Sequence, residues 1–197
     1  MIKETGRNLE EELVREAVGQ MRKNGVDGFS ARAVAEACGV SCAAPFKYFN
    51  GRQGLFLAIS EYLDRELLQM MEEIERRFGT DYKKAHLEMN TVYIRYLCEN
   101  PFLISEYFWR TINEGQAGIR KWRSFQKMAA QFRSYCRERG IPQEVYKSYY
   151  FNFQTLAYGA AFVTVNSLLL EGSDVWTGIG DLQERIYRNL EETMGLA

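Results

Sequence analysis

One stretch of the chain, residues 30–55, constrains the fold more than any other: SARAVAEACGVSCAAPFKYFNGRQGL. Ser30 is a favourable N-cap, because its hydroxyl can accept a hydrogen bond from the free N–H groups of a first helical turn. Gly39 stands where helices commonly end in a left-handed residue, a conformation that glycine adopts without steric cost. Between them the apolar residues keep the i, i+3, i+4, i+7 spacing of one helix face: Ala31, Val34, Ala35 and Cys38. A helix over residues 31–38 is therefore predicted.

A second helix is predicted over residues 42–49, with Ser41 as its N-cap. Phe46 and Phe49 are three residues apart, and this spacing predicts that both rings point into the protein. Pro45 falls in the first turns, where a proline costs a helix least. Two short helices joined by a glycine-containing turn match the helix-turn-helix pattern, whose second helix lies in the major groove of DNA.

These residues resemble the DNA-binding domain of the TetR/AcrR (tetracycline-repressor-like) family of transcriptional regulators. The resemblance rests on several spaced positions and covers about the first quarter of the chain: Ser30, Val34-Ala35, Cys38-Gly39-Val40-Ser41, Phe46-Lys47-Tyr48-Phe49 and Arg52-Gln53-Gly54-Leu55. Two departures concern contacts to DNA. Phe46 replaces the family's common Tyr and so lacks a hydroxyl for phosphate, whereas Arg52 replaces Lys and adds a planar, bidentate donor.

The resemblance implies that the start of the second helix faces the bases. Lys47 can donate to guanine or to a phosphate, whereas Ala43 and Ala44 offer only methyl contacts, for example to thymine. Phosphate contacts are expected from side chains around the motif and from backbone donors at helix N-termini. The full set predicted to contact DNA is Ser30, Arg32, Ser41, Cys42, Ala43, Phe46, Lys47, Tyr48 and Arg52. For each residue the alternative is simple exposure to solvent, and for Phe46 it is packing.

The rest of the chain shows helical patterns and no strand-like alternation, so an all-α fold is predicted. A three-helix head, residues 1–55, is expected to join a larger helical body, residues 56–197, through one long helix from Arg52 to Phe78. That helix has a continuous apolar face: Leu55, Phe56, Ile59, Leu63, Leu67, Met70, Met71 and Ile74. Other helices are expected over residues 9–23, 81–99, 119–139, 142–170 and 181–194, with one more opening at Pro101.

Aromatic residues are concentrated in the body. The chain has 12 Phe, 12 Tyr and 3 Trp, and all but four of these follow residue 55. Flat rings and tyrosine hydroxyls suit a cavity for a small, partly apolar molecule, which the resemblance also implies; an ordinary core is the alternative. The candidate ligand-binding residues are Tyr93, Tyr96, Trp109, Trp122, Phe125, Tyr149 and Phe153.

The last two predicted helices are the candidates for a dimer interface. Gly159 and Ala160 would allow a partner helix to approach closely, and the residues after them add apolar area. In the TetR/AcrR family the corresponding helices of two subunits form a four-helix bundle, and burial inside a monomer is the alternative. The predicted interface residues are Gly159, Ala160, Phe162, Val163, Ile186 and Leu190.

Composition excludes several classes. The net charge of −1, with eight Lys/Arg against seven Asp/Glu through residue 55, neither supports nor opposes nucleic-acid binding. Four dispersed cysteines and no apolar signal segment predict a reducing cytoplasm, and no apolar run reaches the ~18 residues of a membrane span. With His86 as the single histidine, no metal or other cofactor is expected. A thiol switch at Cys38 or Cys42 stays open, and no catalytic motif indicates an enzyme.

The sequence therefore predicts a cytoplasmic, homodimeric, DNA-binding transcriptional regulator. The preferred form is a repressor that a small, partly apolar effector releases from a palindromic operator. The alternative is a structural or interaction protein on the same fold with no effector, which the alanine-rich second helix and near-neutral head favour.

Overall fold

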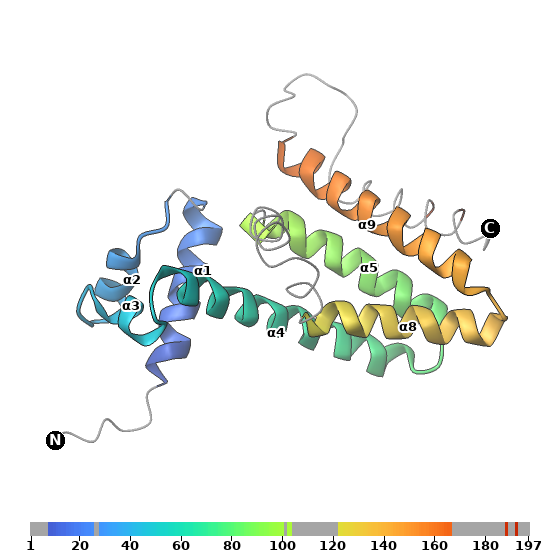
Figure 1. Ribbon diagram of the computed structural model, residues 1–197, viewed down its shortest axis with the longest axis horizontal. Helices are drawn as coiled ribbons and strands as arrows, with labels where there is room; N and C mark the ends of the chain where they lie inside the picture. Colours follow the sequence, from blue (N-terminus) through green and yellow to red (C-terminus); the bar gives the residue numbers. More distant parts are fainter. Residues whose placement is uncertain are drawn as a thin grey trace. The chain divides into compact units, whose positions relative to one another are not determined.

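The computed structural model describes residues 8–25, 28–100, 102–103, 122–166, 188 and 192. Within residues 153–166 it describes the backbone and, beyond that, only the surroundings of Thr155 and Gly159. The described part of the chain contains seven helices and no strand, so the predicted all-α class is confirmed (Figure 1). The contacts divide the chain into two compact units, Met1–Arg65 and Glu66–Ala197, and the boundary between them falls inside one long helix.

The first unit contains α1 (Leu9–Asn24), α2 (Ala31–Ala37), α3 (Ala44–Tyr48) and the first half of α4 (Arg52–Phe78). Helix α2 contacts both α1 and α3, which gives the predicted helix-turn-helix arrangement. The core is built from the apolar faces of these helices, and the Phe29 ring meets the Phe56 ring edge-on with centroids 5.7 Å apart. Its most buried side chains are Leu13, Val14, Ala17, Val18, Met21, Val34, Ala35, Leu55 and Ile59.

Helix α2 begins and ends as its capping residues predict. The Ser30 hydroxyl accepts from the Ala33 N–H at 3.4 Å. At the other end Gly39 adopts φ +69°, in the left-handed region. Its N–H donates to the Glu36 carbonyl at 3.1 Å, and the Val40 N–H donates to the Ala35 carbonyl at 2.9 Å. This pair of bonds is a Schellman motif, which turns the chain sharply toward α3.

The predicted start of the second helix is wrong by two residues. Helix α3 begins at Ala44, and its N-cap is Ala43, which makes no side-chain capping bond, so Ser41 is not the N-cap. Instead, the Ser41 carbonyl accepts from the Ala44 N–H at 2.8 Å, closing a turn before the helix. The predicted inward pairing is also wrong, because Phe49 is buried while Phe46 is 41% exposed. Phe49 is already the C-cap, with φ −103° and ψ 14°, so helical spacing no longer relates the two rings.

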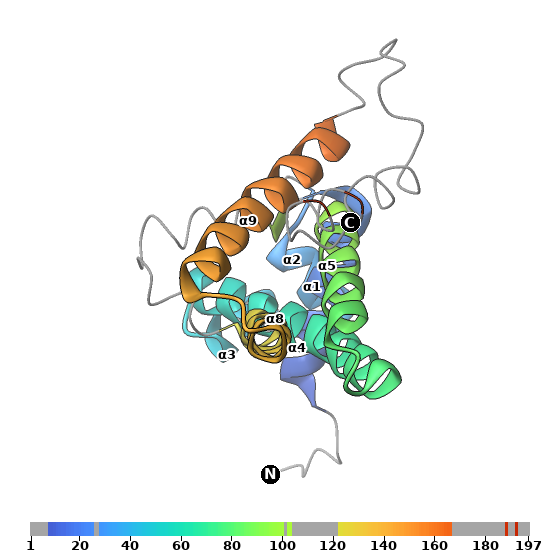
Figure 2. The same cartoon turned by 90° about the vertical axis from the view of Figure 1, so that its right-hand side faces the viewer.

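The second unit contains the rest of α4, α5 (Tyr82–Glu99), α8 (Arg123–Arg139) and α9 (Gln143–Asn166). Helix α5 lies against both α8 and α9, as Figures 1 and 2 show. Helix α4 has the predicted bounds, but Met70, assigned to its apolar face, is 43% exposed. Asp81 caps α5 by accepting from the Lys84 N–H at 3.2 Å, and left-handed Gly140 ends α8.

The remaining predicted helices lie largely outside the described residues. Of the helix expected at Pro101, only residues 102–103 are described, and both are helical. The helix expected over residues 181–194 is represented by Arg188 and Glu192 alone, which are also helical. Within the described part of the chain, no helix is both long and apolar enough to span a membrane.

Candidate functional site

Helix α3 is held by its buried residues and presents the rest to solvent. Ala44, Pro45 and Phe49 are buried against the head, so Ala44 cannot offer the methyl contact predicted for it. All of the residues predicted to contact DNA are exposed: Ser30, Arg32, Ser41, Cys42, Ala43, Phe46, Lys47, Tyr48 and Arg52. Tyr48, at 52%, and Phe46 are the most exposed large rings in the head. The surface around α3 therefore combines cations, hydroxyls and accessible rings.

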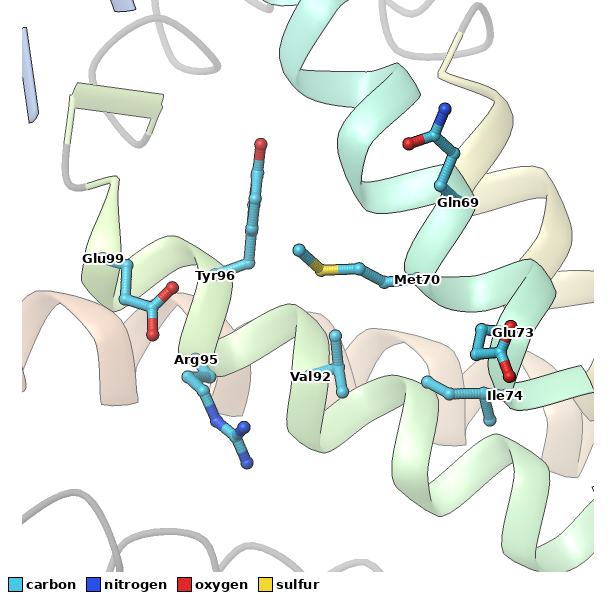
Figure 3. A pocket seen from close by; sticks show the side chains of 8 residues that line it. All are labelled: Gln69, Met70, Glu73, Ile74, Val92, Arg95, Tyr96 and Glu99. Atoms are coloured by element: carbon cyan, nitrogen blue, oxygen red, sulfur yellow. The ribbon is translucent and has the colours of Figure 1, made fainter. Parts of the chain in front are cut away.

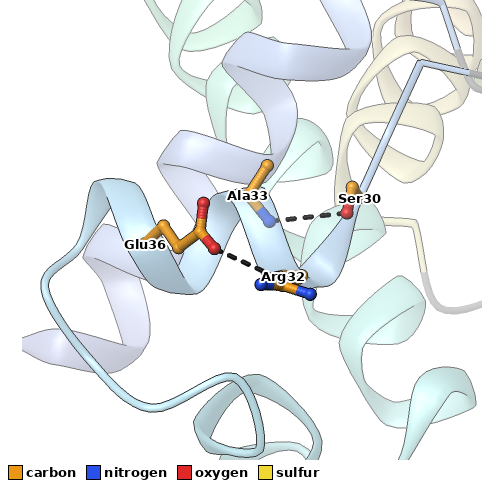
Figure 4. Close-up of polar contacts among 4 residues, drawn as sticks. All are labelled: Ser30, Arg32, Ala33 and Glu36. Carbon is orange, nitrogen blue, oxygen red and sulfur yellow. Dashed lines mark hydrogen bonds and ion pairs between the residues drawn. The ribbon is translucent and has the colours of Figure 1, made fainter.

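Arg32 is oriented by an acidic neighbour that the sequence analysis did not single out. Its Nε lies 3.1 Å from Glu36 Oε1, one turn further along α2 (Figure 4). This bond and the charge of Glu36 raise the pKa of Arg32, with a smaller contribution from Cys42. Arg32 and Cys42 are thus close enough to interact, although they come from different segments of the motif. The i, i+4 spacing of Arg32 and Glu36 was the available signal in the sequence.

Arg52 and Gly54 fix the junction between α3 and α4. The Arg52 guanidinium lies over the Phe56 ring, 5.5 Å from its centroid, which keeps the cation at the start of α4. A Cβ at Gly54 would overlap the carbonyl oxygen of Phe49. The close approach of the two backbones therefore requires glycine at this position.

The thiols in the head differ in accessibility. Cys38 is buried, whereas Cys42 is exposed, and neither forms a disulfide. Among the described residues, no group of three or more His, Cys, Asp or Glu is placed to hold a metal ion.

The described ring contacts place the candidate ligand residues of the body in two groups. Tyr93 and Phe125 meet edge-on at 5.0 Å between ring centroids, and Trp122 packs against Phe125 at 5.8 Å. Tyr149 belongs to a separate group of rings with Phe132, 4.0 Å between centroids. These rings and Tyr96 are buried. Trp109 and the Phe153 side chain lie outside the described residues.

His86, which the sequence left as an ordinary surface or core residue, lies in that second group. It is buried, stacks on Phe132 with 4.7 Å between ring centroids, and places Nε2 2.9 Å from the Tyr149 hydroxyl oxygen. Burial lowers the pKa of His86 to about 3, against a smaller opposing effect of the Met128 backbone. Asn90, one turn later on α5, is also fully buried. Spacing on α5 relates His86 to Asn90, but no sequence signal relates either to Tyr149.

Tyr96 lines a groove of about 500 Å³ between α4 and α5 (Figure 3). The side chains of Tyr96 and Met70 point into it from opposite sides, and the Tyr96 hydroxyl donates to Glu66 Oε2 at 2.9 Å. The groove mixes apolar and charged walls, namely Gln69, Met70, Glu73, Ile74, Val92, Arg95, Tyr96 and Glu99.

Helix α9 exposes two large apolar side chains. Phe151 is 71% exposed and Val145 is 48% exposed, both unusual for large apolar side chains. Thr155 and Gly159 are exposed at successive four-residue steps from Phe151, and a Cβ at Gly159 would meet nothing within 4 Å. Among the predicted interface residues, Ala160, Phe162 and Val163 belong to α9 but their side chains are outside the described residues, as are Ile186 and Leu190 entirely.

Comparison with known proteins agrees with this architecture. Residues 13–59 match the family model of bacterial regulatory proteins, tetR family. None of the curated proteins compared with the chain matches it.

Solved structures share the fold over nearly the whole chain. A TetR transcription regulator from Haloarcula marismortui is 16% identical with a TM-score of 0.64, covering 95% of this chain and 97% of its own. A protein from Rhodococcus sp., described as a candidate TetR-family transcriptional regulator, is 15% identical with a TM-score of 0.65 and coverage of 94% and 98%. A protein with unknown function from Rhodococcus sp. RHA1 is 20% identical with a TM-score of 0.66 and coverage of 96% and 98%.

Because their sequence identities to this chain are low, the solved structures show only a shared fold. The sequence pattern of the family lies in the helix-turn-helix segment. Residues 13–59 include the whole of α2, α3 and the turn between them, which is the segment whose sequence resembles the family. Residues 13–59 therefore resemble the tetR family of bacterial regulatory proteins in sequence, and the chain as a whole shares its fold with the solved structures.

Proposed function

We propose that this regulator is a homodimeric repressor that leaves a palindromic operator when a small, partly apolar effector binds its body. In this proposal, residues 1–55 read DNA, while residues 56–197 dimerise and bind the effector. The effector acts by binding the non-DNA geometry of the dimer more tightly than the DNA-bound one.

The observation that carries the proposal is the exposed surface around α3. Lys47 and Tyr48 are exposed on α3, the second helix of the helix-turn-helix, which in such motifs lies in the major groove. Ser30, Arg32 and Arg52 are exposed around it. Lysine and arginine can donate to guanine acceptors or to phosphate, and helix N-termini add backbone donors. Because Ala44 and Pro45 are buried, α3 is anchored to the head on one side and accessible on the other.

The exposed Phe151 side chain of α9 supports dimerisation. Phe151 is 71% exposed, and Gly159 lies two turns further along the same side of the helix. Because the space around the Gly159 Cα is open, a partner helix could pack closely there and cover the Phe151 ring. Two heads on one palindrome must place their recognition helices ~34–36 Å apart, one DNA turn, so a change in dimer geometry switches binding. We expect Phe151→Asp to give a monomer by sedimentation equilibrium while retaining the helical circular dichroism spectrum; an unchanged dimer would exclude this face.

The buried rings and the groove beside Tyr96 support an effector site in the body. Both lie in the second unit, and the groove alone offers about 500 Å³, enough for a small organic molecule. A regulator without an effector is the competing function, and a broad compound set that never alters the melting temperature or DNA affinity would favour it.

Selection of bound sequences from a random DNA duplex pool tests the proposal. Wild-type protein is expected to enrich a palindrome, and Lys47→Ala to lose that enrichment. Lys23→Ala is the matched control, because it removes the same charge from the same unit at the exposed end of α1. Affinity for the selected site should fall steeply with salt, and Lys47→Ala should reduce that slope.

The selection is repeated on protein unfolded and refolded to remove any bound ligand. Enrichment of a palindrome that Lys23→Ala retains and Lys47→Ala loses supports the proposal. No enrichment before or after refolding, or equal losses in both variants, would count against it.

A further inference from the structure

Helix α3 carries an apolar aromatic ring on its exposed side. Phe46 is 41% exposed, whereas its neighbours Ala44 and Pro45 are buried. The Lys47 N–H donates to the Ala43 carbonyl at 3.0 Å, so the helical turn already includes Ala43. Ala43, Phe46 and Lys47 therefore have the i, i+3, i+4 spacing of one helix face, and all three are exposed. These three residues are here called the outer face of α3.

The outer face offers few hydrogen bonds to DNA bases. In the major groove, Arg or Lys pairs with guanine and Asn or Gln with adenine, whereas Asp or Glu accepts from cytosine. Residues 41–48, which include α3 and the turn before it, contain none of these residue types except Lys47. Apart from Lys47, the outer face consists of a methyl group and a phenyl ring. Any base recognition by Ala43 and Phe46 must therefore use apolar contacts.

The two arginines of residues 30–55 lie on the helices before and after α3. Arg32 belongs to α2, where its Nε lies 3.1 Å from Glu36 Oε1. Arg52 begins α4, where its guanidinium lies over the Phe56 ring, 5.5 Å from the centroid. Charged donors at such flanking positions suit the phosphates, which set the orientation of a protein on DNA but carry no sequence information. The arginines therefore do not change the apolar character of the outer face.

Thymine has the matching apolar group. Its 5-methyl group lies in the major groove, the other three bases lack it, and alanine and phenylalanine are among the side chains that contact it. A phenyl ring covers a methyl group without burying a hydroxyl that would need a hydrogen-bond partner. We propose that Phe46 and Ala43 recognise the 5-methyl group of a thymine in each operator half-site, while Lys47 supplies the charged contact. This deepens the proposed function and rests on it, because α3 must enter the major groove.

Deoxyuridine tests the assignment, because it differs from thymidine only by lacking the 5-methyl group. In the palindrome obtained by selection, each thymine on either strand of one half-site is replaced in turn, and affinity is measured by fluorescence anisotropy. At the recognised position the wild-type protein should bind about fourfold more weakly, which corresponds to one methyl group that is no longer buried. Replacement at this position in both half-sites should weaken binding about fifteenfold.

A variant of Phe46 shows whether the methyl group acts through this ring. Phe46→Ala should bind the thymine operator more weakly, and deoxyuridine should then reduce its affinity by less than about twofold, because the two changes remove the same contact. Leu57→Ala is the matched control, since Leu57 is also 41% exposed in the head but lies on α4. It should keep the wild-type affinity and the full deoxyuridine effect. Both variants should keep the helical circular dichroism spectrum, because both side chains are exposed.

Three results would overturn the inference. The first is a selected half-site without an A·T pair, and the second is a half-site in which no deoxyuridine weakens binding. The third is an equal deoxyuridine effect in the wild type and in Phe46→Ala, since the methyl group would then act through the shape or stiffness of the DNA. Each of these results leaves an operator and therefore the proposed function intact. The absence of any enriched palindrome would contradict both proposals.

Discussion

Lowering the pH should destabilise the body of this protein through one residue. His86 is the single histidine of the chain, it is 2% exposed, and burial lowers its pKa to about 3. In the unfolded chain a histidine has a pKa of about 6.5. Below pH 6.5 the unfolded state therefore binds a proton at His86, whereas the folded state does not. The stability that neutral His86 contributes is complete above pH 6.5 and is lost as the pH falls from 6.5 to about 3.

The size of this effect follows from the two pKa values. Each pH unit between them changes the free energy of unfolding by about 1.4 kcal/mol, so pH 5 lies about 2 kcal/mol below pH 7.5. That difference is a large fraction of the stability of an ordinary domain. Asp and Glu side chains contribute little over this range, because most of them titrate below pH 5.

Urea unfolding at pH 7.5, 6.5, 5.5 and 5.0 measures the effect. Tryptophan fluorescence is the appropriate signal, since Trp109, Trp122 and Trp176 all belong to the second unit, as does His86. His86→Phe is the comparison, because it keeps a ring against Phe132 and cannot take up a proton. The free energy of unfolding of His86→Phe is expected to be lower than that of the wild type at every pH but to change little between pH 7.5 and 5. The difference between the two proteins should therefore shrink by about 2 kcal/mol on going to pH 5. Parallel curves would refute a buried, neutral His86.

The head offers further tests. Gly54→Ala should destabilise the protein by about 1–3 kcal/mol, since the added Cβ overlaps a carbonyl oxygen at the end of α3. Gly19→Ala, where a Cβ meets nothing within 4 Å, should instead stabilise α1 by about 0.5–1 kcal/mol in the same urea titration followed by circular dichroism. Ser30→Ala should lower the free energy of unfolding by about 1 kcal/mol, because it removes the N-cap hydrogen bond of α2. Glu36→Gln should raise operator affinity about fivefold at low salt by fluorescence anisotropy, because it removes about 1 kcal/mol of repulsion and releases Arg32.

Each of these expectations has an opposite outcome that contradicts it. A stable Gly54→Ala protein would mean that α3 and α4 separate without cost. Unchanged stability in Ser30→Ala would mean that water replaces the capping bond. Weaker DNA binding by Glu36→Gln would mean that Glu36 orients Arg32 toward a phosphate, and that this outweighs the repulsion between Glu36 and the DNA.

Local chemistry is what the sequence predicted well. The bounds of α4, the Ser30 cap and the left-handed Gly39 follow from interactions within one helical turn, and the structure has all three. The start of α3 was missed because Ser41 can serve either as a cap or in a turn, and nearby residues do not decide between them. The exposure of Phe46 was missed because helical spacing was extended to Phe49, where the helix has already ended.

Contacts across the body depended on the tertiary structure. His86 and Tyr149 are 63 residues apart, and nothing in their own neighbourhoods indicates that they meet. The neutral state of His86 is likewise a property of its burial, which arises only when α5 packs against α8 and α9. Residues 30–55 thus determined by themselves the helix-turn-helix head, since caps, glycines and apolar spacing act locally. Only tertiary packing decided which polar groups of the body are buried and which of them meet, because burial and pairing depend on residues distant in the chain.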